Sequence, residues 1–357
     1  MKVALVYDWL DAWGGAERVL LELKKIFPQA PIYTSLCRST QVKPLLNQFS
    51  KVNASFLQKS PPVLNWRWLA PLMPLAFESF SFDEFDLVIS VAGFAAKGII
   101  TKPSTQHICY LLTPTRFLWS QDQYQNNRIP KKVQSYLKQW DLIAAQRPDQ
   151  IVSISQTVQA RCQKVYQRKS HLIYPPVDTK TFFSNQSPSS KKRKFFLIVS
   201  RLEERKKVDL AIRTFNDLGW PLVIVGTGSQ EKKLKKLAKK NIKFLGFLSD
   251  KKLAQYYRKA QALIFPQEED FGLVALEAQA CQTPVIAFAA GGATETIRKN
   301  KTGKFFYPQS SFALKKVLLK WSQNGYNTKS FHPWVKKFSQ ESFASAWQRL
   351  IKTYVGS

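Results

Sequence analysis

Histidine and cysteine are scarce in this chain of 357 residues, which contains three histidines and four cysteines. The cysteines are scattered and form no C-x-x-C pair: Cys37, Cys109, Cys162 and Cys281. This pattern disfavours a zinc site, and a disulfide framework is unusual in a chain of this size. With so few histidines, the chain has few candidate residues for a metal centre or a catalytic triad. We therefore expect neither a metal ion nor a bound cofactor.

Long apolar runs are also missing. The run Val3–Tyr7 stops at Asp8 and is too short for a signal peptide. No stretch approaches the roughly 18 to 20 apolar residues that span a bilayer. Both absences predict a cytoplasmic location, and they leave peripheral association with the inner face of the membrane open.

Acidic residues are few relative to basic ones, with 24 Asp and Glu against 54 Lys and Arg, a formal net charge of +30. Such a surface attracts polyanions, which include nucleic acid, an anionic bilayer and a phosphorylated substrate. We find no zinc pattern, RNA-binding aromatic motif or helix-turn-helix, so binding of a specific nucleic acid would rest on charge alone.

Two segments are candidates for contact with a membrane. Residues Glu231–Lys240 place six lysines around Leu234 and Leu237 on a predicted helix. Such a helix can lie on an anionic membrane, although inward packing of the two leucines is the more ordinary interpretation. The second segment, Trp66–Leu75, contains prolines that rule out one long helix, and we expect its apolar side chains to be buried.

Apolar strand patterns alternate with amphipathic helical patterns along the chain, which predicts an α/β fold with parallel sheets covered by helices on both faces. The predicted strands are Val3–Tyr7, Leu87–Ser90, His107–Leu112, Ile151–Ile154, Phe195–Ser200, Leu222–Val225, Ile242–Leu245, Ala262–Phe265 and Pro284–Phe288. The predicted helices include Ala16–Ile26, Thr157–Tyr166, Val208–Leu218, Leu273–Cys281 and Glu341–Tyr354. Residues 184–194 are polar, Ser-rich and basic, as in an interdomain linker.

In open α/β sheets, ligands bind at the carboxyl ends of the strands. The first strand is followed there by Gly14-Gly15-Ala16-Glu17 and a predicted helix. Paired glycines allow backbone to approach a ligand, and the start of the helix offers N–H groups to an anion. A tight turn that needs glycine for its dihedral angles explains the pair equally well. The pattern is not G-x-G-x-x-G, so dinucleotide binding is disfavoured.

A second motif leaves the strand that begins the second half of the chain. Residues 201–207, RLEERKK, contain four cations in seven positions. A diphosphate leaving group carries charge that Arg and Lys neutralise in a protein without a metal. A solvated charged loop is the alternative, but the position at the end of a strand favours the ligand.

The most specific motif lies in residues 265–278, where Glu269 and Glu277 stand eight residues apart. Phe271-Gly272 opens a helix whose first N–H groups are available to phosphate or sugar oxygens. Glu277 falls among Leu, Ala and Val on this helix, and such a carboxylate needs hydrogen-bond donors, which ribose hydroxyls would supply. An ordinary acid near a helix start explains Glu269 but not Glu277.

This segment resembles the E-x7-E motif of retaining GT-B glycosyltransferases of family four, also called group 1, and the resemblance extends over nearly the whole chain. The other matching motifs occur in the family's order: Gly14–Glu17, Tyr174–Asp178, Ser200–Lys206, Thr283–Ala287, Gly291-Gly292 and Thr302-Gly303. The resemblance implies two Rossmann-like domains facing a central cleft. It implies an acceptor-binding domain at 1–184, a linker at 185–194, a nucleotide-sugar-binding domain at 195–328, and a helix in 329–357 that packs back on the first domain.

The resemblance also implies roles for individual residues. Arg201 and Lys206 would hold the donor diphosphate, Glu277 the ribose, and Glu269 the transferred sugar. The remaining donor contacts would come from Gly15, Gly246, Phe271, Gly272 and Leu273, and the acceptor side would include Trp9, Gly14, Glu17 and Arg116. The reaction would retain the anomeric configuration without a metal ion, and the leaving phosphate oxygen would accept the acceptor's proton.

Three positions depart from the family pattern. Leu112 stands where the Y-x-H-T-P segment has a histidine, which puts activity or acceptor choice in doubt. Lys207 and Gln282 stand where glycine is common. The surroundings of Trp9, Arg116 and Trp119 look like those of mannosyl-transferring members of polysaccharide and lipopolysaccharide biosynthesis, which favours GDP-mannose over UDP-sugars and a lipid-linked or saccharide acceptor.

Three other functions stay open on the sequence. One is a nucleotide-sugar epimerase or a phosphorylase of the same fold. Another is a transferase that has kept its donor pocket but changed its catalysis. The third is a basic protein that binds nucleic acid.

Overall fold

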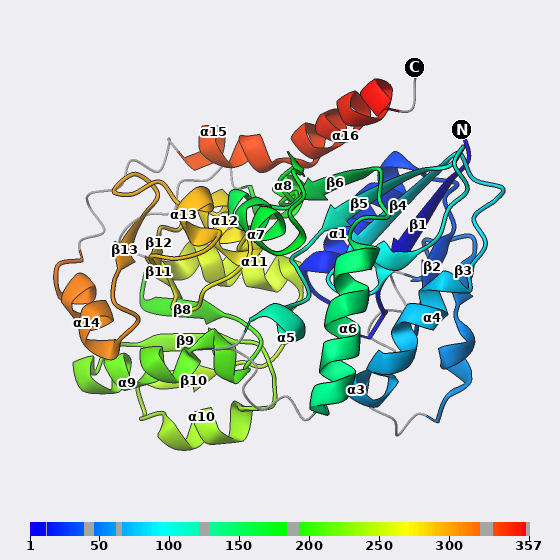
Figure 1. Ribbon diagram of the computed structural model, residues 1–357. Helices are drawn as coiled ribbons and strands as arrows, with labels where there is room; N and C mark the ends of the chain where they lie inside the picture. Colours follow the sequence, from blue (N-terminus) through cyan, green and yellow to red (C-terminus); the bar gives the residue numbers. More distant parts are fainter. Residues whose placement is uncertain are drawn as a thin grey trace. The chain divides into compact units, whose positions relative to one another are not determined.

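The computed structural model describes residues 1–11, 13–38, 46–61, 66–120, 129–183, 193–321 and 331–354, with backbone only for Trp66 and Arg67. The chain divides into two units (Figure 1). The first comprises Met1–Tyr174 and Phe343–Ser357, and the second comprises Pro175–Ser342. The predicted linker at 185–194 lies almost wholly outside the described residues. No helix in the described ranges is long and apolar enough to cross a membrane.

The first unit is built on a sheet of seven parallel strands in the order β3-β2-β1-β4-β5-β6-β7. Its strands are β1 (Val3–Tyr7), β2 (Ile32–Thr34), β3 (Val52–Ala54), β4 (Leu87–Ala92), β5 (Gln106–Leu111), β6 (Gln150–Ser153) and β7 (His171–Leu172). Every residue of β1 and β4 is buried, because helices cover both faces of a parallel sheet and continuous apolar runs are then stable.

Helices of the first unit follow the strands. They are α1 (Gly15–Ile26), α3 (Trp66–Leu69), α4 (Met73–Glu78), α5 (Arg116–Trp119), α6 (Lys131–Ala144), α7 (Gln156–Tyr166) and α16 (Gln340–Tyr354), with 3-10 turns η2 (Phe56–Lys59), η3 (Ala70–Leu72) and η4 (Ala96–Gly98). Helix α16 begins in the second unit, and its buried Phe343 and Trp347 lie edge-on to the Tyr110 ring of β5 at centroid distances of 6.1 and 5.5 Å.

The second unit holds six parallel strands in the order β10-β9-β8-β11-β12-β13. They are β8 (Phe195–Val199), β9 (Leu222–Val225), β10 (Ile242–Phe244), β11 (Ala260–Phe265), β12 (Val285–Phe288) and β13 (Gly303–Phe306). Its helices are α8 (Thr179–Phe182), α9 (Val208–Leu218), α10 (Glu231–Leu237), α11 (Asp250–Lys259), α12 (Leu273–Ala280), α13 (Ala293–Thr296), α14 (Ser311–Leu319) and α15 (Phe331–Val335), with 3-10 turns η6 (Glu204–Lys206) and η9 (Lys336–Phe338).

The α/β prediction with parallel sheets is confirmed, and each predicted strand is found to within two residues at either end. One prediction about burial is wrong in part. In the segment Trp66–Leu75, Met73 is buried, but Trp68, Leu72 and Leu75 are 75%, 45% and 56% exposed. The segment forms three short helical turns, because prolines interrupt it, and one side of these turns faces solvent. In α10, by contrast, Leu234 is buried as expected.

Candidate active site

The candidate donor-site residues of the second unit gather at one edge of its sheet. Arg201 and Lys206 lie in the connection from β8 to α9, Gly246 follows β10, and Glu269 follows β11. Glu277 is the fifth residue of α12. Because all six strands are parallel, the connections that leave their carboxyl ends share this edge.

Lys206 and Glu269 are in direct contact. The ammonium group of Lys206 donates to Oε1 of Glu269, and both side chains are largely withdrawn from solvent, at 9% and 16% exposure. The guanidinium of Arg205 lies 3.8 Å from Oε2 of the same carboxylate. Burial lowers the pKa of Lys206, the negative charge of Glu269 opposes this, and the positive charges of Arg205 and Arg201 add to it. Several cations therefore surround one carboxylate.

Arg201 stands at the open side of this cluster, with its side chain 60% exposed and 3.4 Å from the carboxylate of Glu203. The same carboxylate accepts a hydrogen bond from Nε of Arg205 at 3.0 Å. Glu203 and Arg205 were not predicted as site residues, since adjacent charges in a basic loop look alike. Glu203 holds the two arginines, and Arg201 is the cation most accessible to an incoming anion.

Glu277 is buried to 4% exposure on α12, as its position among apolar residues predicted. The hydroxyl of Tyr257, on α11, donates to its Oε2 at 2.9 Å. Tyr257 was missed, because a tyrosine in an amphipathic helix gives no sign of the helix it will face. One of the donors that this carboxylate needs thus comes from the protein itself.

Backbone contacts fix the connection that carries Glu269. The amide of Gly292 donates to the carbonyl oxygen of Glu269 at 2.8 Å. A Cβ on Gly292 would lie 2.3 Å from Cα of Phe271, and one on Gly291 would lie 2.3 Å from the oxygen of Glu269. Both positions therefore require glycine, and the Gly291-Gly292 pair acts as the support for Glu269.

Two other glycines of the site have left-handed backbone. Gly272, with φ of +96°, precedes the first turn of α12, where Leu273 begins the helix. Gly246 has φ of +66°, and its carbonyl oxygen accepts the amide of Gly226 at 2.7 Å. No protein atom lies within 4 Å of a Cβ built on Gly246, so the space beside this residue is open.

The candidate acceptor-side residues belong to the first unit. Gly14 precedes α1, Gly15 is its first residue, and buried Glu17 accepts a hydrogen bond from the hydroxyl of Tyr7 at 2.6 Å. Trp9 follows β1 and is half-buried. Its neighbour Asp8 was not predicted, although its buried carboxylate accepts three backbone N–H bonds and ties the end of β1 to the turn that follows β4.

Arg116 begins α5, and a buried polar network holds this short helix. Asp141 of α6 accepts hydrogen bonds from the ammonium of Lys97 at 2.5 Å and the indole of Trp119 at 2.7 Å. The hydroxyls of Thr115 and Tyr166 also donate to Asp141, at 2.6 and 2.8 Å. Nothing in the sequence indicated this network, since its members come from four separate segments.

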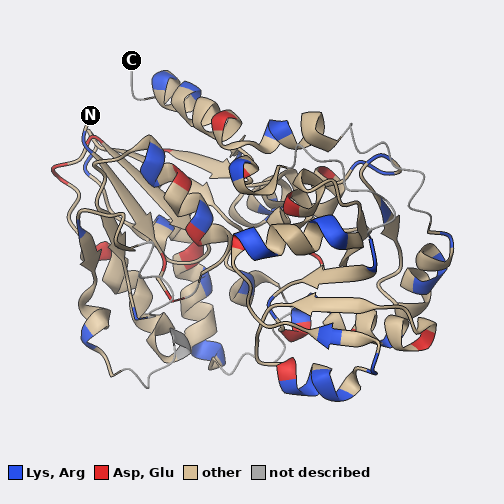
Figure 2. Ribbon diagram, turned by 180° about the vertical axis from the view of Figure 1, so that it is seen from behind, with Lys and Arg blue, Asp and Glu red and all other residues tan. Residues whose placement is uncertain are grey.

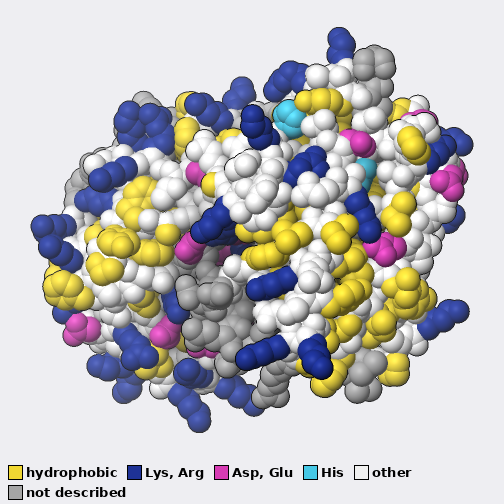
Figure 3. All heavy atoms as spheres, in the orientation of Figure 1, with side chains coloured by type: hydrophobic (Ala, Val, Ile, Leu, Met, Phe, Trp, Pro, Cys, Tyr) yellow, Lys and Arg dark blue, Asp and Glu magenta, His cyan; other side chains and the backbone are white. Residues whose placement is uncertain are grey.

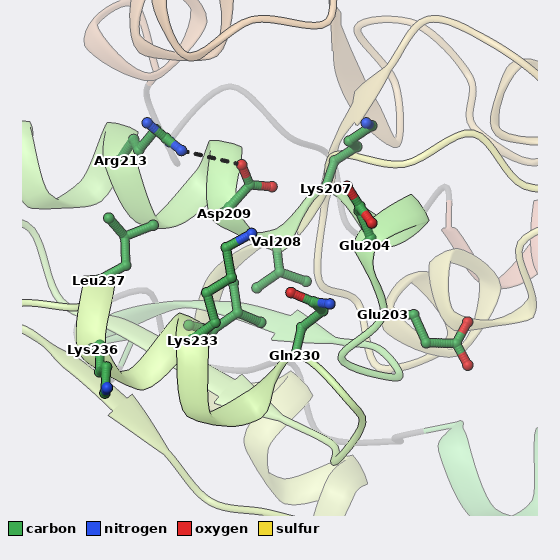
Figure 4. A pocket seen from close by; sticks show the side chains of 11 residues that line it. Glu203, Glu204, Lys207, Val208, Asp209, Arg213, Gln230, Lys233, Lys236 and Leu237 are labelled. Carbon is green, nitrogen blue, oxygen red and sulfur yellow. Dashed lines mark ion pairs between the residues drawn. The ribbon is translucent and has the colours of Figure 1, made fainter. Parts of the chain in front are cut away.

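A cavity of about 360 Å³ lies behind the cationic turn, between α9 and α10 (Figure 4). Val208, Leu234 and Leu237 form its apolar lining, and the charged side chains around it are Glu203, Glu204, Lys207, Asp209, Arg213, Lys233 and Lys236. Of the predicted donor-site residues none lines it. The described residues contain no group of three or more His, Cys, Asp or Glu side chains that could hold a metal ion.

A family model described as "Glycosyl transferases group 1" matches residues 179–337. This part of the chain belongs to that family. The matched segment includes the cationic turn, Glu269, Glu277 and the Gly291-Gly292 support. The resemblance inferred from the motifs is thereby confirmed for the group 1 glycosyltransferase domain.

Relatives and solved structures agree with this family. A probable sucrose-phosphate synthase of Thermosipho melanesiensis is 30% identical over 208 residues, which cover 52% of this chain and 46% of that protein. The chain spans about half the length of the curated relatives it matches. Sucrose-phosphate synthase of Thermosynechococcus elongatus shares 16% identity over all of both chains with a TM-score of 0.75. HepE of Anabaena, in complex with UDP and glucose, shares 19% identity over 99% of both chains with a TM-score of 0.76. The fold is accordingly that of GT-B glycosyltransferases.

Proposed function

We propose that this protein is a glycosyltransferase that transfers a hexose from a nucleotide diphosphate sugar to an acceptor hydroxyl. The observation that carries the proposal is the cluster of Arg201, Arg205 and Lys206 around Glu269, together with the buried carboxylate of Glu277 on α12. A diphosphate and a sugar need this combination, because the phosphates require cations and the hydroxyls require acceptors.

In the proposed complex the donor diphosphate meets the accessible guanidinium of Arg201 and the ammonium of Lys206. Glu269 would then share Lys206 with the phosphates and accept hydrogen bonds from hydroxyls of the transferred sugar. The anomeric carbon–phosphate oxygen bond breaks, the acceptor oxygen bonds to the same face of the sugar, and the leaving phosphate oxygen takes the acceptor's proton. Positive charge fixed in place before the reaction stabilises the charge that develops on the diphosphate, so this proposal needs no metal ion.

The base and the sugar of the donor form a finer part of the proposal. The surroundings of Trp9, Arg116 and Trp119 favour mannose from GDP-mannose, whereas the HepE structure contains UDP. Both bases would use the open space beside Gly246, so the titration described below is designed to separate them.

The acceptor side of the proposal assigns the first unit, with Trp9, Gly14, Glu17 and Arg116, to a lipid-linked or saccharide acceptor. The net charge of +30 supports an acceptor presented at an anionic membrane surface. WaaG, a glycosyltransferase involved in lipopolysaccharide biosynthesis, shares the fold with a TM-score of 0.68 at 17% identity.

Calorimetric titration with GDP-mannose, UDP-glucose, UDP-N-acetylglucosamine, GDP and UDP tests the donor site. We expect one nucleotide series to bind and Glu277→Ala to weaken it at least about tenfold, since loss of hydrogen bonds to a charged group costs about 1.5–3 kcal/mol. Tyr257→Phe is the matched control, because it keeps the carboxylate and removes one of its donors. Absence of binding by all five compounds would refute the assignment.

A second function is favoured by Leu112, which is half-buried at the end of β5, next to Gly93. A donor-binding protein with altered catalysis would bind the nucleotide sugar but transfer it slowly. The variant Leu112→His distinguishes the two functions: a large gain in transfer with unchanged donor affinity supports altered catalysis, and unchanged transfer supports the active wild-type enzyme.

A further inference from the structure

Three helices, α9, α10 and α14, lie side by side on one face of the second sheet (Figure 1). The side-chain amide of Asn216 in α9 donates to the carbonyl oxygen of Leu237 at the end of α10, at 2.7 Å. On the other side of α9, Asp217 forms an ion pair with Lys315 of α14. Their outward side chains form a continuous surface, made by residues 208–218, 231–240 and 311–320, which we call the three-helix face.

Cations are in excess on the three-helix face. Its acidic residues are each paired, Asp209 with Arg213 at 3.7 Å, Glu231 with Lys235 at 2.6 Å, and Asp217 with Lys315. Further lysines are exposed and have no acidic partner among the residues that the structure describes: Lys232, Lys233, Lys236, Lys240, Lys316 and Lys320. Basic residues are prominent on these helices when the molecule is seen from behind (Figure 2). The face is therefore suited to a polyanionic surface.

Large apolar side chains stand among these lysines on α14. Phe312 is 77% exposed and Leu319 is 61% exposed. They are seven residues apart, so they project from the same side of the helix, with exposed Lys316 between them. Hydrophobic side chains are visible between basic ones at the left-hand end of the surface (Figure 3). Phe and Leu that alternate with Lys on one helix side are typical of helices that lie at a bilayer interface.

The side chains of the three-helix face favour a bilayer over a nucleic acid as its partner. Phosphates of either partner would contact the lysines, but only acyl chains would bury Leu319, which has no flat ring on which a base could stack. The cavity between α9 and α10 is lined by Arg213, Lys233 and Lys236 together with the acids Glu203, Glu204 and Asp209 (Figure 4). Because its charges are mixed, the exposed lysines of the face, and not this cavity, are suited to lipid phosphates.

We propose that the three-helix face docks on an anionic lipid bilayer, with Phe312 and Leu319 among the acyl chains and the unpaired lysines over the lipid phosphates. The proposal rests on the membrane part of the proposed function and adds to it the surface that makes the contact. It assigns membrane docking to the unit that carries the donor-site residues.

Co-sedimentation of the full-length protein with vesicles tests this surface. We expect binding to vesicles of phosphatidylglycerol and phosphatidylcholine, weak binding to phosphatidylcholine alone, and release by salt. The variant Lys233→Gln/Lys236→Gln/Lys316→Gln should bind more than about tenfold more weakly, since each lysine near such a surface contributes about fivefold. The variant Phe312→Ser/Leu319→Ser should lose affinity even for strongly anionic vesicles.

Matched controls lie outside the face. Lys259→Gln/Lys299→Gln/Lys301→Gln removes the same charge, and Ile100→Ser/Ile143→Ser removes two other exposed apolar side chains; both should retain wild-type vesicle binding. The proposal is overturned if a control loses as much affinity as its test variant. It is also overturned if the wild-type protein does not bind anionic vesicles. A third contrary outcome would favour nucleic acid: the Phe312 and Leu319 substitutions leave vesicle binding intact, while the lysine substitutions abolish a salt-sensitive gel shift.

Failure of docking and failure of the proposed function are distinguishable. Titration with GDP and UDP reports the donor site in the absence of lipid, and the test variants should bind the nucleotide as wild type does. Conversely, Glu277→Ala should lose nucleotide binding and still sediment with the vesicles.

Discussion

The ammonium of Lys206 and the carboxylate of Glu269 are in contact although 63 residues separate them in the chain. The contact joins the connections that leave β8 and β11, the two central strands of the second sheet. In the proposed complex the donor phosphates would contact the same ammonium group that Glu269 contacts here.

Replacement of this carboxylate should make stability depend on an anion. Glu269→Gln leaves the buried ammonium of Lys206 with neighbouring cations and should lower the free energy of unfolding by about 1–3 kcal/mol. A nucleoside diphosphate should restore the balance of charge, so it should raise the melting temperature of Glu269→Gln more than that of wild type. Thermal unfolding with and without GDP or UDP measures both effects. Glu204→Gln, in the same turn, is the control and should behave as wild type; equal ligand-induced shifts in all three proteins would contradict the prediction.

Gly292 and Gly246 differ in what surrounds them: Gly292 packs against backbone next to Glu269, and Gly246 faces open space. Gly292→Ala should distort the Glu269 connection, because its Cβ would lie 2.3 Å from backbone, and should weaken both stability and nucleotide binding. Gly246→Ala meets no protein atom within 4 Å and should cost only about 1–2 kcal/mol for its left-handed φ. If the base lies beside Gly246, this methyl group should nevertheless weaken nucleotide binding. Urea unfolding and calorimetry on both variants test this, and unchanged nucleotide affinity in Gly246→Ala would move the base elsewhere.

Lys207 and Gln282 stand where the family commonly has glycine, and both retain the left-handed backbone conformation that glycine adopts most easily. Lys207 and Gln282 have φ of +50° and +59°. Substitution by glycine should relieve a cost of about 1–2 kcal/mol, offset by about 0.5–1 kcal/mol of added chain entropy in the unfolded state. We expect Lys207→Gly and Gln282→Gly to be up to about 1 kcal/mol more stable in urea unfolding. Gly219→Ala at the other end of α9, where φ is +67°, makes the opposite change and serves as the control. It should lower the free energy of unfolding.

His107 should make the first unit sensitive to acid. Its Nε2 lies 2.8 Å from the hydroxyl of Ser90, and burial, with the charges of Arg147 and Arg168, lowers its pKa to about 3. Between that value and the usual pKa near 6.5 the unfolded chain binds the extra proton, so stability is complete above about pH 6.5 and falls as the pH drops, by about 1.4 kcal/mol per unit.

The variant His107→Gln should show a flatter dependence between pH 6.5 and 4 in urea unfolding. Asp8, whose pKa is raised by burial, acts in the opposite direction in both proteins, so the difference between them isolates His107. Parallel pH profiles would show that His107 does not determine acid stability.

Most strands of the two sheets could be predicted from the sequence, because a buried parallel strand is a short apolar run between turns. Val3–Tyr7 and Leu222–Val225 occur as predicted. Strands β2, β3, β7 and β13 were missed. The first three have only two or three residues, which carry no periodicity, and β13 is a four-residue run that begins with glycine. The exposure of Trp68 was missed for a related reason: hydrophobicity indicates burial, but it does not show which side of a short helical turn the protein covers.

Within the site, the sequence motifs correctly indicated residues that lie together in the fold, such as Lys206 and Glu269. They did not indicate the residues outside the motifs that contact these side chains. Tyr257 reaches Glu277 from another helix, and Asp141 accepts hydrogen bonds from donors in three other segments. Such contacts depend on helix packing, which leaves no local pattern in the sequence.

The last helix places Trp347 in the core of the first unit, where it is fully buried beside Tyr110. The first unit is therefore completed by a helix that follows the whole of the second unit in the sequence. Until α16 has been synthesised, the ring of Tyr110 lacks two of its aromatic neighbours, Phe343 and Trp347. A nascent chain that ends before Phe343 would hold an intact second sheet and an unfinished first unit, so the second unit is the one able to reach its final packing while the chain is still being made.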